Sequence, residues 1–479
     1  MIAARSRRGC ELRRFFRTLL IIVALLISTV LIAAAVFRVD RPLRIGVSAV
    51  AHDLCSKAFI SGLDPDQVFA DSLATREGLK TIASAIHYQV DQAKHEARVK
   101  LGMTGLFSAR AVFYPGFGCI VLHGALPKEL PSSAQLMAAR SNAGAILPDI
   151  AGPEVVEPQD AKLRQALSDA FEEPADGPPR RTKAVVVVHD GHVIAERYAH
   201  GFGVDTPMMG FSMTKSVLNA LVGVLVMQGR VKIAAPAPIQ AWSQPNDPRR
   251  AITIEQLMRM TSGLDLDEED VGPANPSDQM LYLQRDMTAF AQSRKLIAAP
   301  GTRFAYSSGD TQIVSGVVRA AAGPAAIDAF ELADRELFAP LGMHHVTVEV
   351  DATGTMIGCN YMFASARDWA RFGLLYADDG IVGDRRILPA GWIDFSTSPT
   401  LGSSYGAGFW TARGKGGLAD ALRENGVPSD AFLASGNLGQ RLLIIPSLHL
   451  VIVRLGDATD LTHDVRGLML LARDVIASL

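Results

Sequence analysis

The stretch FSMTKSVLNALVGVLVMQG, residues 211–229, joins a polar opening to an almost uninterrupted apolar run. The run predicts a buried helix, because a helix without a polar face belongs in a core. Ser212 and Lys215 are three positions apart and share one face of that helix. A helix N-terminus favours negative charge developing on a serine, and a buried lysine can be held neutral and take part in proton transfer. We therefore expect Ser212 to be a nucleophile assisted by Lys215; the alternative is a serine cap beside a solvated lysine.

Further motifs follow in the same chain. In order they read TIEQL at 253–257, MTSGL at 260–264, PGTRFAYSSG at 300–309, LFAPLGM at 337–343 and YGAGFW at 405–410. Together with Ser212 and Lys215, the set resembles the penicillin-recognising serine hydrolases. That superfamily contains class C β-lactamases, D-alanyl-D-alanine carboxypeptidases, family VIII esterases and 6-aminohexanoate-dimer hydrolases. The resemblance covers about residues 180–456 and implies the β-lactamase-like fold.

The resemblance also assigns a base. A phenol is a poor base at neutral pH unless a nearby cation stabilises its phenolate. Tyr306 stands at the family's tyrosine position, so we expect it to accept the proton of Ser212. Ser308 stands where many relatives carry asparagine, and a hydroxyl cannot replace both functions of an amide. This change argues against a finely tuned β-lactamase.

A third family motif, a cation followed by threonine and glycine on a strand, matches weakly at ASGNLGQ, residues 434–440. The resemblance implies an oxyanion hole made by the backbone amides of Ser212 and Asn437, with Ser435 and Gly436 beside the substrate. Ala434 stands where relatives carry lysine or histidine. We therefore expect the site to lack one cation for a substrate carboxylate, and Ala434→Lys to restore it.

Strand signals lie at both ends of this region. Two hairpins are expected, at 184–198 around Asp190-Gly191 and at 441–455, followed by a helix at 461–479. The expected fold is α/β of the α+β type: an antiparallel sheet flanked by helices, with an inserted helical region.

The N-terminus indicates a membrane. Residues 1–17 hold six arginines and one acid, and residues 18–37 hold no charge. Twenty apolar residues can span a bilayer, and the basic flank should stay in the cytoplasm. We expect an uncleaved anchor in a bacterial inner membrane, with a periplasmic remainder. A cleaved signal peptide is the alternative, because Ala33-Ala34-Ala35 resembles a cleavage site.

The chain is expected to divide into four parts: a tail and anchor at 1–40, an exported accessory segment at 41–145, a proline-rich linker at 146–180 and the hydrolase domain at 181–479. The linker is expected to contain a helix at 161–173. The accessory segment is expected to contain a helix near 77–100. In an oxidising compartment, Cys55 and Cys119 are expected to form a disulfide. Cys359 is expected to be a buried core thiol.

Composition excludes other classes. With 479 residues, 48% hydrophobic and 20% charged, the chain is globular, and a net charge of −2 gives no basis for nucleic-acid binding. The histidines at 189, 192 and 200 lack the spacing of a zinc site, so no metal is expected. Acyl-enzyme chemistry on a serine needs no organic cofactor, so none is expected either. The acidic run at 265–270 is interpreted as a solvated loop.

These observations predict an exported serine hydrolase that cleaves a small amide or ester, similar to the dimer-hydrolase and esterase branch. Two alternatives stay open. One is a β-lactamase or D-alanyl-D-alanine carboxypeptidase, and the other is a non-catalytic envelope protein that keeps the fold for binding.

Overall fold

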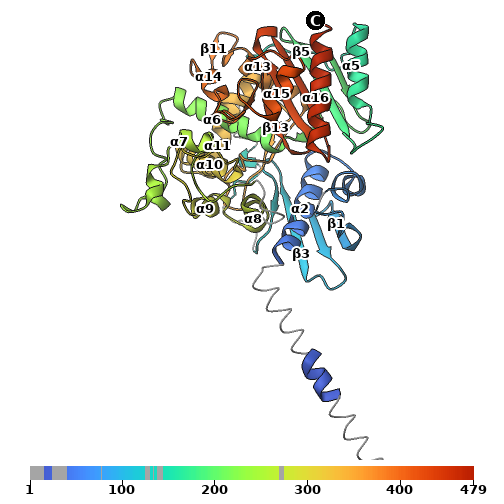
Figure 1. Cartoon of the computed structure of the whole chain (residues 1–479), viewed down its shortest axis with the longest axis vertical. Helices are drawn as coiled ribbons and strands as arrows, with labels where there is room; N and C mark the ends of the chain where they lie inside the picture. Colours follow the sequence, from blue (N-terminus) through green and yellow to red (C-terminus); the bar gives the residue numbers. More distant parts are fainter. Residues whose placement is uncertain are drawn as a thin grey trace, which may run out of the picture.

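The computed structural model describes residues 16–23, 40–76, 78–124, 130–132, 134–136, 144–268 and 275–479. Its centre is a six-stranded antiparallel sheet in the order β12-β13-β14-β15-β5-β6 (Figure 1). The strands are β12 (Trp410–Thr411), β13 (Phe432–Gly436), β14 (Gln440–Ile445), β15 (Leu450–Gly456), β5 (Thr182–His189) and β6 (His192–Tyr198). The C-terminal hairpin β14–β15 therefore inserts beside β5, as the sequence predicts.

Helices cover both faces of this sheet. On one face α5 (Ala161–Phe171) and α16 (Leu461–Ile476) pack on Val185 and Val187. On the other face lie α6 (Thr214–Met227) and α13 (Ala366–Ala377), which bury Val186 and Val188. Burial on both faces explains why β5 is continuously apolar instead of alternating.

The inserted region lies between β6 and β13. Its other helices are α7 (Ile254–Met258), α8 (Pro276–Leu283), α9 (Met287–Gln292), α10 (Ser308–Ala322), α11 (Ala326–Ala333), α12 (Ala339–Leu341), α14 (Trp392–Thr397) and α15 (Gly417–Glu424). It also contains a small antiparallel sheet in the order β7-β9-β8, formed by β7 (Met208–Met209), β9 (Met362–Ala364) and β8 (Thr347–Val348), and the two-stranded pair β10 (Ile381–Val382) and β11 (Arg385–Arg386).

The accessory segment contains one long helix against a second sheet. The helix α2 (Asp40–Phe59) packs on the antiparallel strands β1 (Ile86–Asp91), β2 (Glu96–Leu101), β3 (Phe107–Tyr114) and β4 (Gly118–Val121). The expected helix at 77–100 is therefore wrong. Apolar residues alternate at 86, 88 and 90 and again at 97, 99 and 101, which is the period of a hairpin, and His95 supplies a left-handed turn residue with φ of 52°.

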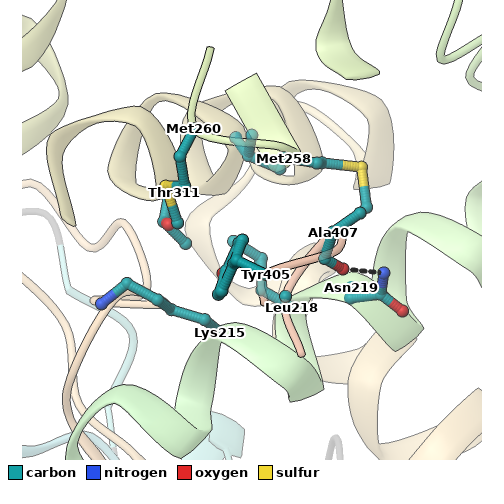
Figure 2. A pocket seen from close by; sticks show the side chains of 10 residues that line it. Lys215, Leu218, Asn219, Met258, Met260, Thr311, Tyr405 and Ala407 are labelled. Carbon is teal, nitrogen blue, oxygen red and sulfur yellow. Dashed lines mark hydrogen bonds between the residues drawn. The ribbon is translucent and has the colours of Figure 1, made fainter. Parts of the chain in front are cut away.

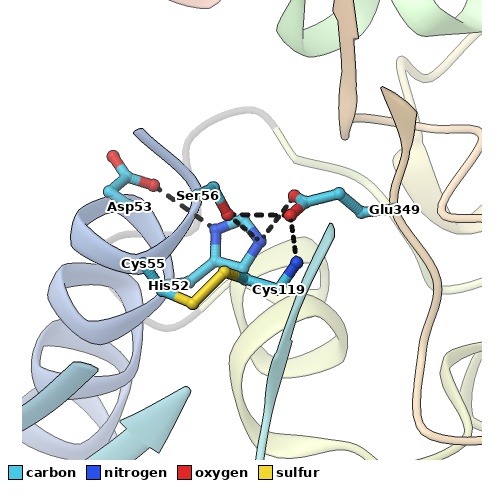
Figure 3. Close-up of a disulfide and its surroundings, with 6 residues drawn as sticks. All are labelled: His52, Asp53, Cys55, Ser56, Cys119 and Glu349. Atoms are coloured by element: carbon cyan, nitrogen blue, oxygen red, sulfur yellow. Dashed lines mark hydrogen bonds and ion pairs between the residues drawn. A yellow bond between two sulfur atoms is a disulfide. The ribbon is translucent and has the colours of Figure 1, made fainter. Parts of the chain in front are cut away.

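A disulfide joins Cys55 on α2 to Cys119 on β4 (Figure 3). The two residues are 64 positions apart, and closing a loop of that length stabilises a fold by about 4 kcal/mol when chain entropy alone is considered.

The bridge adjoins a buried polar contact with the hydrolase domain. Glu349 accepts hydrogen bonds from the Ser56 hydroxyl at 2.8 Å and from the Cys119 amide at 2.6 Å, and its other oxygen lies 2.8 Å from His52 Nε2 (Figure 3). Gly118 must be glycine here, because its φ is +72° and a Cβ would lie 2.5 Å from the Glu349 side chain. Glu349 therefore connects the two parts of the molecule at a buried interface.

This contact predicts a pH-dependent stability. Burial alone lowers the pKa of His52, but Glu349 and Asp53 outweigh it and raise the pKa to about 9 from 6.5. Protonated His52 stabilises the fold through Glu349 and Asp53. This stabilisation is complete below pH 6.5 and is lost as the pH rises through about 9. Between these values the free energy of unfolding should fall by up to about 3 kcal/mol. Urea unfolding at pH 6 and pH 9.5 measures this fall, and His52→Gln should reduce it. An equal fall in the variant would contradict this assignment.

The proline-rich segment is held against the hydrolase domain. Ile150 O accepts the amide of Val193 at 2.8 Å, and Val156 exchanges hydrogen bonds with Glu196. Arg367 donates to Gly152 O and Glu154 O, each at 2.7 Å. The described part of this segment, from residue 144, thus follows the edge strand β6.

Within the described residues, no single helix is long and apolar enough to cross a membrane. One pair of helices, Ser308–Ala322 with Ala326–Leu341, is together long and apolar enough, but the two are bent by 92° relative to each other. The expected span at 18–37 is helical over its described part, to residue 23, and otherwise lies outside the described residues.

Candidate active site

The candidate nucleophile lies on a constrained turn. Ser212 is half-buried in a 3₁₀ turn, Phe211–Met213, which leads into α6. Phe211 has a φ of 48°, a left-handed conformation that costs energy for an aromatic residue. Thr214 fixes the turn, since its hydroxyl donates to Phe211 O at 2.7 Å and accepts the Met362 amide at 3.1 Å. The surrounding structure therefore determines where the serine hydroxyl points.

Lys215 lies directly beneath Ser212. Its ammonium donates to Ser212 Oγ at 2.9 Å, to Ser308 Oγ at 3.0 Å and to Cys359 O at 2.8 Å, so all three donors are used. Burial alone lowers the pKa of Lys215, but Tyr306 and the Glu268 carboxylate outweigh it and raise the pKa above its ordinary 10.5. The three acceptors around Nζ and the direction of this shift both favour the ammonium form of Lys215. A neutral Lys215, which burial alone would allow, is therefore not favoured, because a carboxylate and a phenol lie near the ammonium.

Tyr306 and Ser308 come from the chain entering α10. Lys215 Nζ lies 5.0 Å from the centroid of the Tyr306 ring, and this ring stacks on Trp410 at 5.7 Å. Ser307 caps the helix by accepting the Asp310 amide at 2.9 Å. The cap fixes where α10 begins, and it thereby sets Tyr306 at the site and Ser308 under the lysine.

A small cavity of about 10 Å³ lies on the buried side of Lys215 (Figure 2). Its lining includes Leu218 and Tyr405. The loop that carries Tyr405 is held to α6 by Asn219, whose amide donates to Ala407 O at 2.6 Å. A space of this size holds about one water molecule at most. The lysine stem is therefore tightly packed, which limits the positions open to its ammonium.

Glu268 is a site residue that the sequence interpretation missed. Its carboxylate accepts the backbone amide of Ser308, and its side chain lines the same cavity as Ser212 and Tyr306. Its neighbours Asp265 and Asp267 instead pair with Arg294 and Arg303. The interpretation of the acidic run as a solvated loop is therefore wrong at Glu268, because one member of the run turns toward Lys215.

Glu268→Gln should move the alkaline limb of the pH–activity profile toward lower pH. The carboxylate favours the ammonium form of Lys215, so its removal lets Lys215 lose its proton at lower pH. The neutral amide oxygen can still accept the Ser308 amide, which separates charge from geometry. The measurement is kcat/KM for an ester across pH 7 to about 12, corrected for uncatalysed hydrolysis, so that the range includes a limb set by a lysine whose pKa lies above 10.5. Asp265→Asn, in the same loop but paired with Arg294, is the matched control and should leave the limb in place; an unmoved limb in Glu268→Gln would contradict the assignment.

The end of β13 forms the opposite side of the site. Ser435, Gly436 and Asn437 line the cavity with Ser212. A Cβ on Gly436 would lie 2.1 Å from Gly210 O, so only glycine allows the strand to approach the nucleophile turn this closely. Behind the strand, the buried Arg441 guanidinium pairs with Asp464 and donates to Gly436 O at 2.5 Å.

The expectation that a lysine at 434 would serve the substrate is wrong. The Ala434 side chain is 0% exposed, belongs to the core cluster and does not line the cavity. A lysine there would have to enter the core, where an unpaired charge is strongly disfavoured. The charged side chains lining the cavity are Arg76, Glu268 and Asp278, so carboxylates outnumber the guanidinium there.

Two other expectations concern chemistry elsewhere. Cys359 is buried, and burial raises the pKa of its thiol to about 12. Its sulfur is therefore no nucleophile, although its carbonyl holds Lys215. Among the described residues, no group of three or more histidine, cysteine or acidic side chains is arranged to hold a metal ion.

The sequence profile of the beta-lactamase family matches residues 167–474. The chain therefore belongs to the beta-lactamase family, and it is a serine hydrolase. The 6-aminohexanoate-dimer hydrolase of Paenarthrobacter ureafaciens is 27% identical over an alignment of 302 residues, which covers 58% of this chain and 73% of the relative.

Solved structures share the fold. A Bacillus anthracis protein assigned as a 6-aminohexanoate-dimer hydrolase superposes with a TM-score of 0.55 at 22% identity, over 70% of this chain and 90% of the other. A penicillin-binding protein homologue from Caulobacter crescentus superposes with a TM-score of 0.52 at 18% identity, over 69% of this chain and all of the other. At these identities the comparison supports the β-lactamase-like fold.

Proposed function

We propose that this protein cleaves an amide or ester through an acyl-enzyme formed on Ser212. The observation that carries the proposal is the 2.9 Å hydrogen bond from the Lys215 ammonium to Ser212 Oγ, in the same cavity as Tyr306. A nucleophile beside a proton-transfer group on a constrained turn is the arrangement that acyl transfer requires. The family membership and the dimer-hydrolase relative support this reaction class.

In the proposed first step Ser212 Oγ bonds to the substrate carbonyl carbon, and its proton passes to Tyr306. Lys215 stays an ammonium and stabilises the phenolate that must receive the proton. Tyr306 then returns the proton to the leaving oxygen or nitrogen as the carbonyl bond to that atom breaks. A water molecule reverses these roles, releases the acid and restores Ser212. Every proton transfer in this proposed reaction therefore passes through Tyr306, which lies among the described residues.

The developing oxyanion is proposed to accept the amides of Ser212 and Asn437. The Asn437 amide belongs to the same peptide as the Gly436 carbonyl, which accepts the Arg441 guanidinium at 2.5 Å. A cation on that carbonyl polarises the peptide and strengthens its N–H as a donor. Ser308 and Ser435 are proposed to contact the substrate beside this hole.

Neutral esters and amides are favoured over carboxylate-bearing β-lactams. The cavity lining holds Glu268 and Asp278 against Arg76, and burial with the charge of Glu268 raises the pKa of Asp278 to about 6. Arg76 already pairs with Asp53 at 2.8 Å. Among the described residues of this lining, the one cation that an anionic substrate could meet is thus already paired.

The experiment compares kcat/KM for p-nitrophenyl butyrate and nitrocefin. One missing charge-assisted hydrogen bond is worth about 1.5–3 kcal/mol, so the ester should be preferred at least about tenfold. A preference for nitrocefin would establish the β-lactamase alternative instead, and inactivity on both, with no labelling of Ser212, would favour a binding protein.

We further propose that residues 18–37 anchor the chain in a bacterial inner membrane with the hydrolase domain in the periplasm. The arginine-rich flank and the uncharged run support this orientation, and a disulfide between Cys55 and Cys119 suits an oxidising compartment. An alkaline phosphatase fusion after residue 150 should be active in a bacterial host. Activity only with a cytoplasmic reporter at that point would reverse the orientation.

A further inference from the structure

The accessory segment contributes directly to the active-site cavity. This cavity has a volume of about 800 Å³, and its lining combines Ser212 and Tyr306 with residues of α2 and of the stretch 76–82. Figure 1 shows α2 beside α8, and Arg41 on α2 donates to Gln279 on α8 at 3.0 Å. The catalytic serine therefore faces a chamber that the hydrolase domain encloses only together with the accessory segment.

The accessory side of this chamber is mostly apolar. The apolar wall consists of Leu43, Ile45, Ala49, Leu79 and Ile82 of the accessory segment, together with Leu281 of α8. Among the described residues of the accessory segment, the charged side chain that lines the chamber is Arg76, whose guanidinium pairs with Asp53. Gly46 also lines the chamber, and a Cβ there would meet Leu79 at 3.3 Å. The missing side chain therefore lets Leu79 and Ile82 pack closely against α2.

An apolar wall around an open cavity is unfavourable until an apolar group covers it. Ligand sites combine such a wall with a few polar groups that orient the reacting atoms. Here those polar groups are the Ser212 hydroxyl and the end of β13, in the same chamber. The wall is thus continuous with the proposed reaction centre.

We propose that this apolar wall binds an extended acyl chain, so that the substrate is a neutral ester or amide of a medium- or long-chain carboxylic acid. The proposal rests on the proposed function. The acyl group remains bound through both acylation and deacylation, whereas the leaving group departs between them. Contacts with the acyl chain therefore stabilise both transition states.

The test compares p-nitrophenyl butyrate with p-nitrophenyl octanoate. Each methylene that enters an apolar site improves binding about fourfold at full burial, so kcat/KM should rise at least about tenfold over four methylenes with partial burial. Leu43→Ser combined with Ile82→Ser makes two half-buried wall positions polar and should reduce this ratio to about threefold or less. No rise in the wild type, or an unchanged ratio in this variant, would overturn the proposal.

Met103→Ser combined with Leu106→Ser is the matched control. These side chains are 86% and 72% exposed in the same segment and do not line the chamber. The control should keep the wild-type ratio. A reduced ratio in the control as well would mean that general destabilisation, and not the wall, sets the chain preference, and this outcome would also overturn the proposal.

A binding measurement separates this proposal from the proposed function. Ser212→Ala protein should bind N-methyloctanamide at least about tenfold more tightly than N-methylbutanamide in isothermal titration calorimetry. That preference without ester turnover in the wild type would retain the acyl site and refute the hydrolase mechanism. Ester turnover without any such preference would retain the hydrolase mechanism and refute the acyl site.

Discussion

Ser212→Ala is expected to lower the turnover of p-nitrophenyl butyrate by about 10⁴-fold or more. Loss of the nucleophile removes the covalent route, and only the binding and oxyanion contributions to catalysis remain. The substitution removes one hydroxyl from a half-buried position and leaves the Lys215 contacts to Ser308 and Cys359 in place. The folded structure should therefore survive, and circular dichroism with thermal unfolding checks this.

Ser168→Ala serves as the control, because Ser168 is exposed on α5 on the outer face of the sheet. It should retain full turnover. If folded, contamination-free Ser212→Ala retains turnover within tenfold of the wild type, Ser212 is not the nucleophile.

Lys215→Met is expected to lower kcat/KM by about 10³-fold or more. Methionine approximates the length of the buried stem but removes the ammonium that contacts Ser212, Ser308 and Cys359. Proton transfer by a positioned group contributes about 10²–10⁴-fold, and the lost cation also removes support for the phenolate of Tyr306. The rate at which a fluorophosphonate labels Ser212 should fall with the activity.

Stability must be measured alongside, since the variant leaves the Ser308 hydroxyl and the Cys359 carbonyl without their donor. Lys162→Met, on an exposed position of α5, is the matched control. A folded Lys215→Met protein with wild-type labelling rates would show that the lysine is structural.

The sequence alone predicts an element or a site residue wherever the reactive side chains and the apolar periodicity lie within one short segment. The apolar run after Ser212 predicts α6, and the hairpin signals around residues 190 and 446 predict the centre of the sheet. The motif ending in Tyr306 and Ser308 is brought to Lys215 because Ser307 caps α10 at that point. Each of these features depends on neighbours within a few residues, so a single sequence reveals them.

Other features depend on contacts between distant segments. Glu268 resembles its acidic neighbours in sequence, and only the fold turns it toward Ser308. The accessory segment carries no motif, yet α2 forms part of the catalytic chamber. The position of Ala434 in the core depends on how β13 packs against α6, which strand propensity does not specify. The missed hairpin at 86–101 shows that a charged, half-exposed strand pair can resemble a helix when its alternation is overlooked.

Fluorophosphonate labelling followed by intact-protein mass spectrometry and peptide mapping tests the central claim most directly, because the reagent requires an activated serine. We expect a single adduct on the peptide that contains Ser212, no adduct in Ser212→Ala, and loss of ester turnover in proportion to labelling. Ester turnover that persists in the fully labelled protein, or an adduct on any other serine that accounts for the lost turnover, would contradict it.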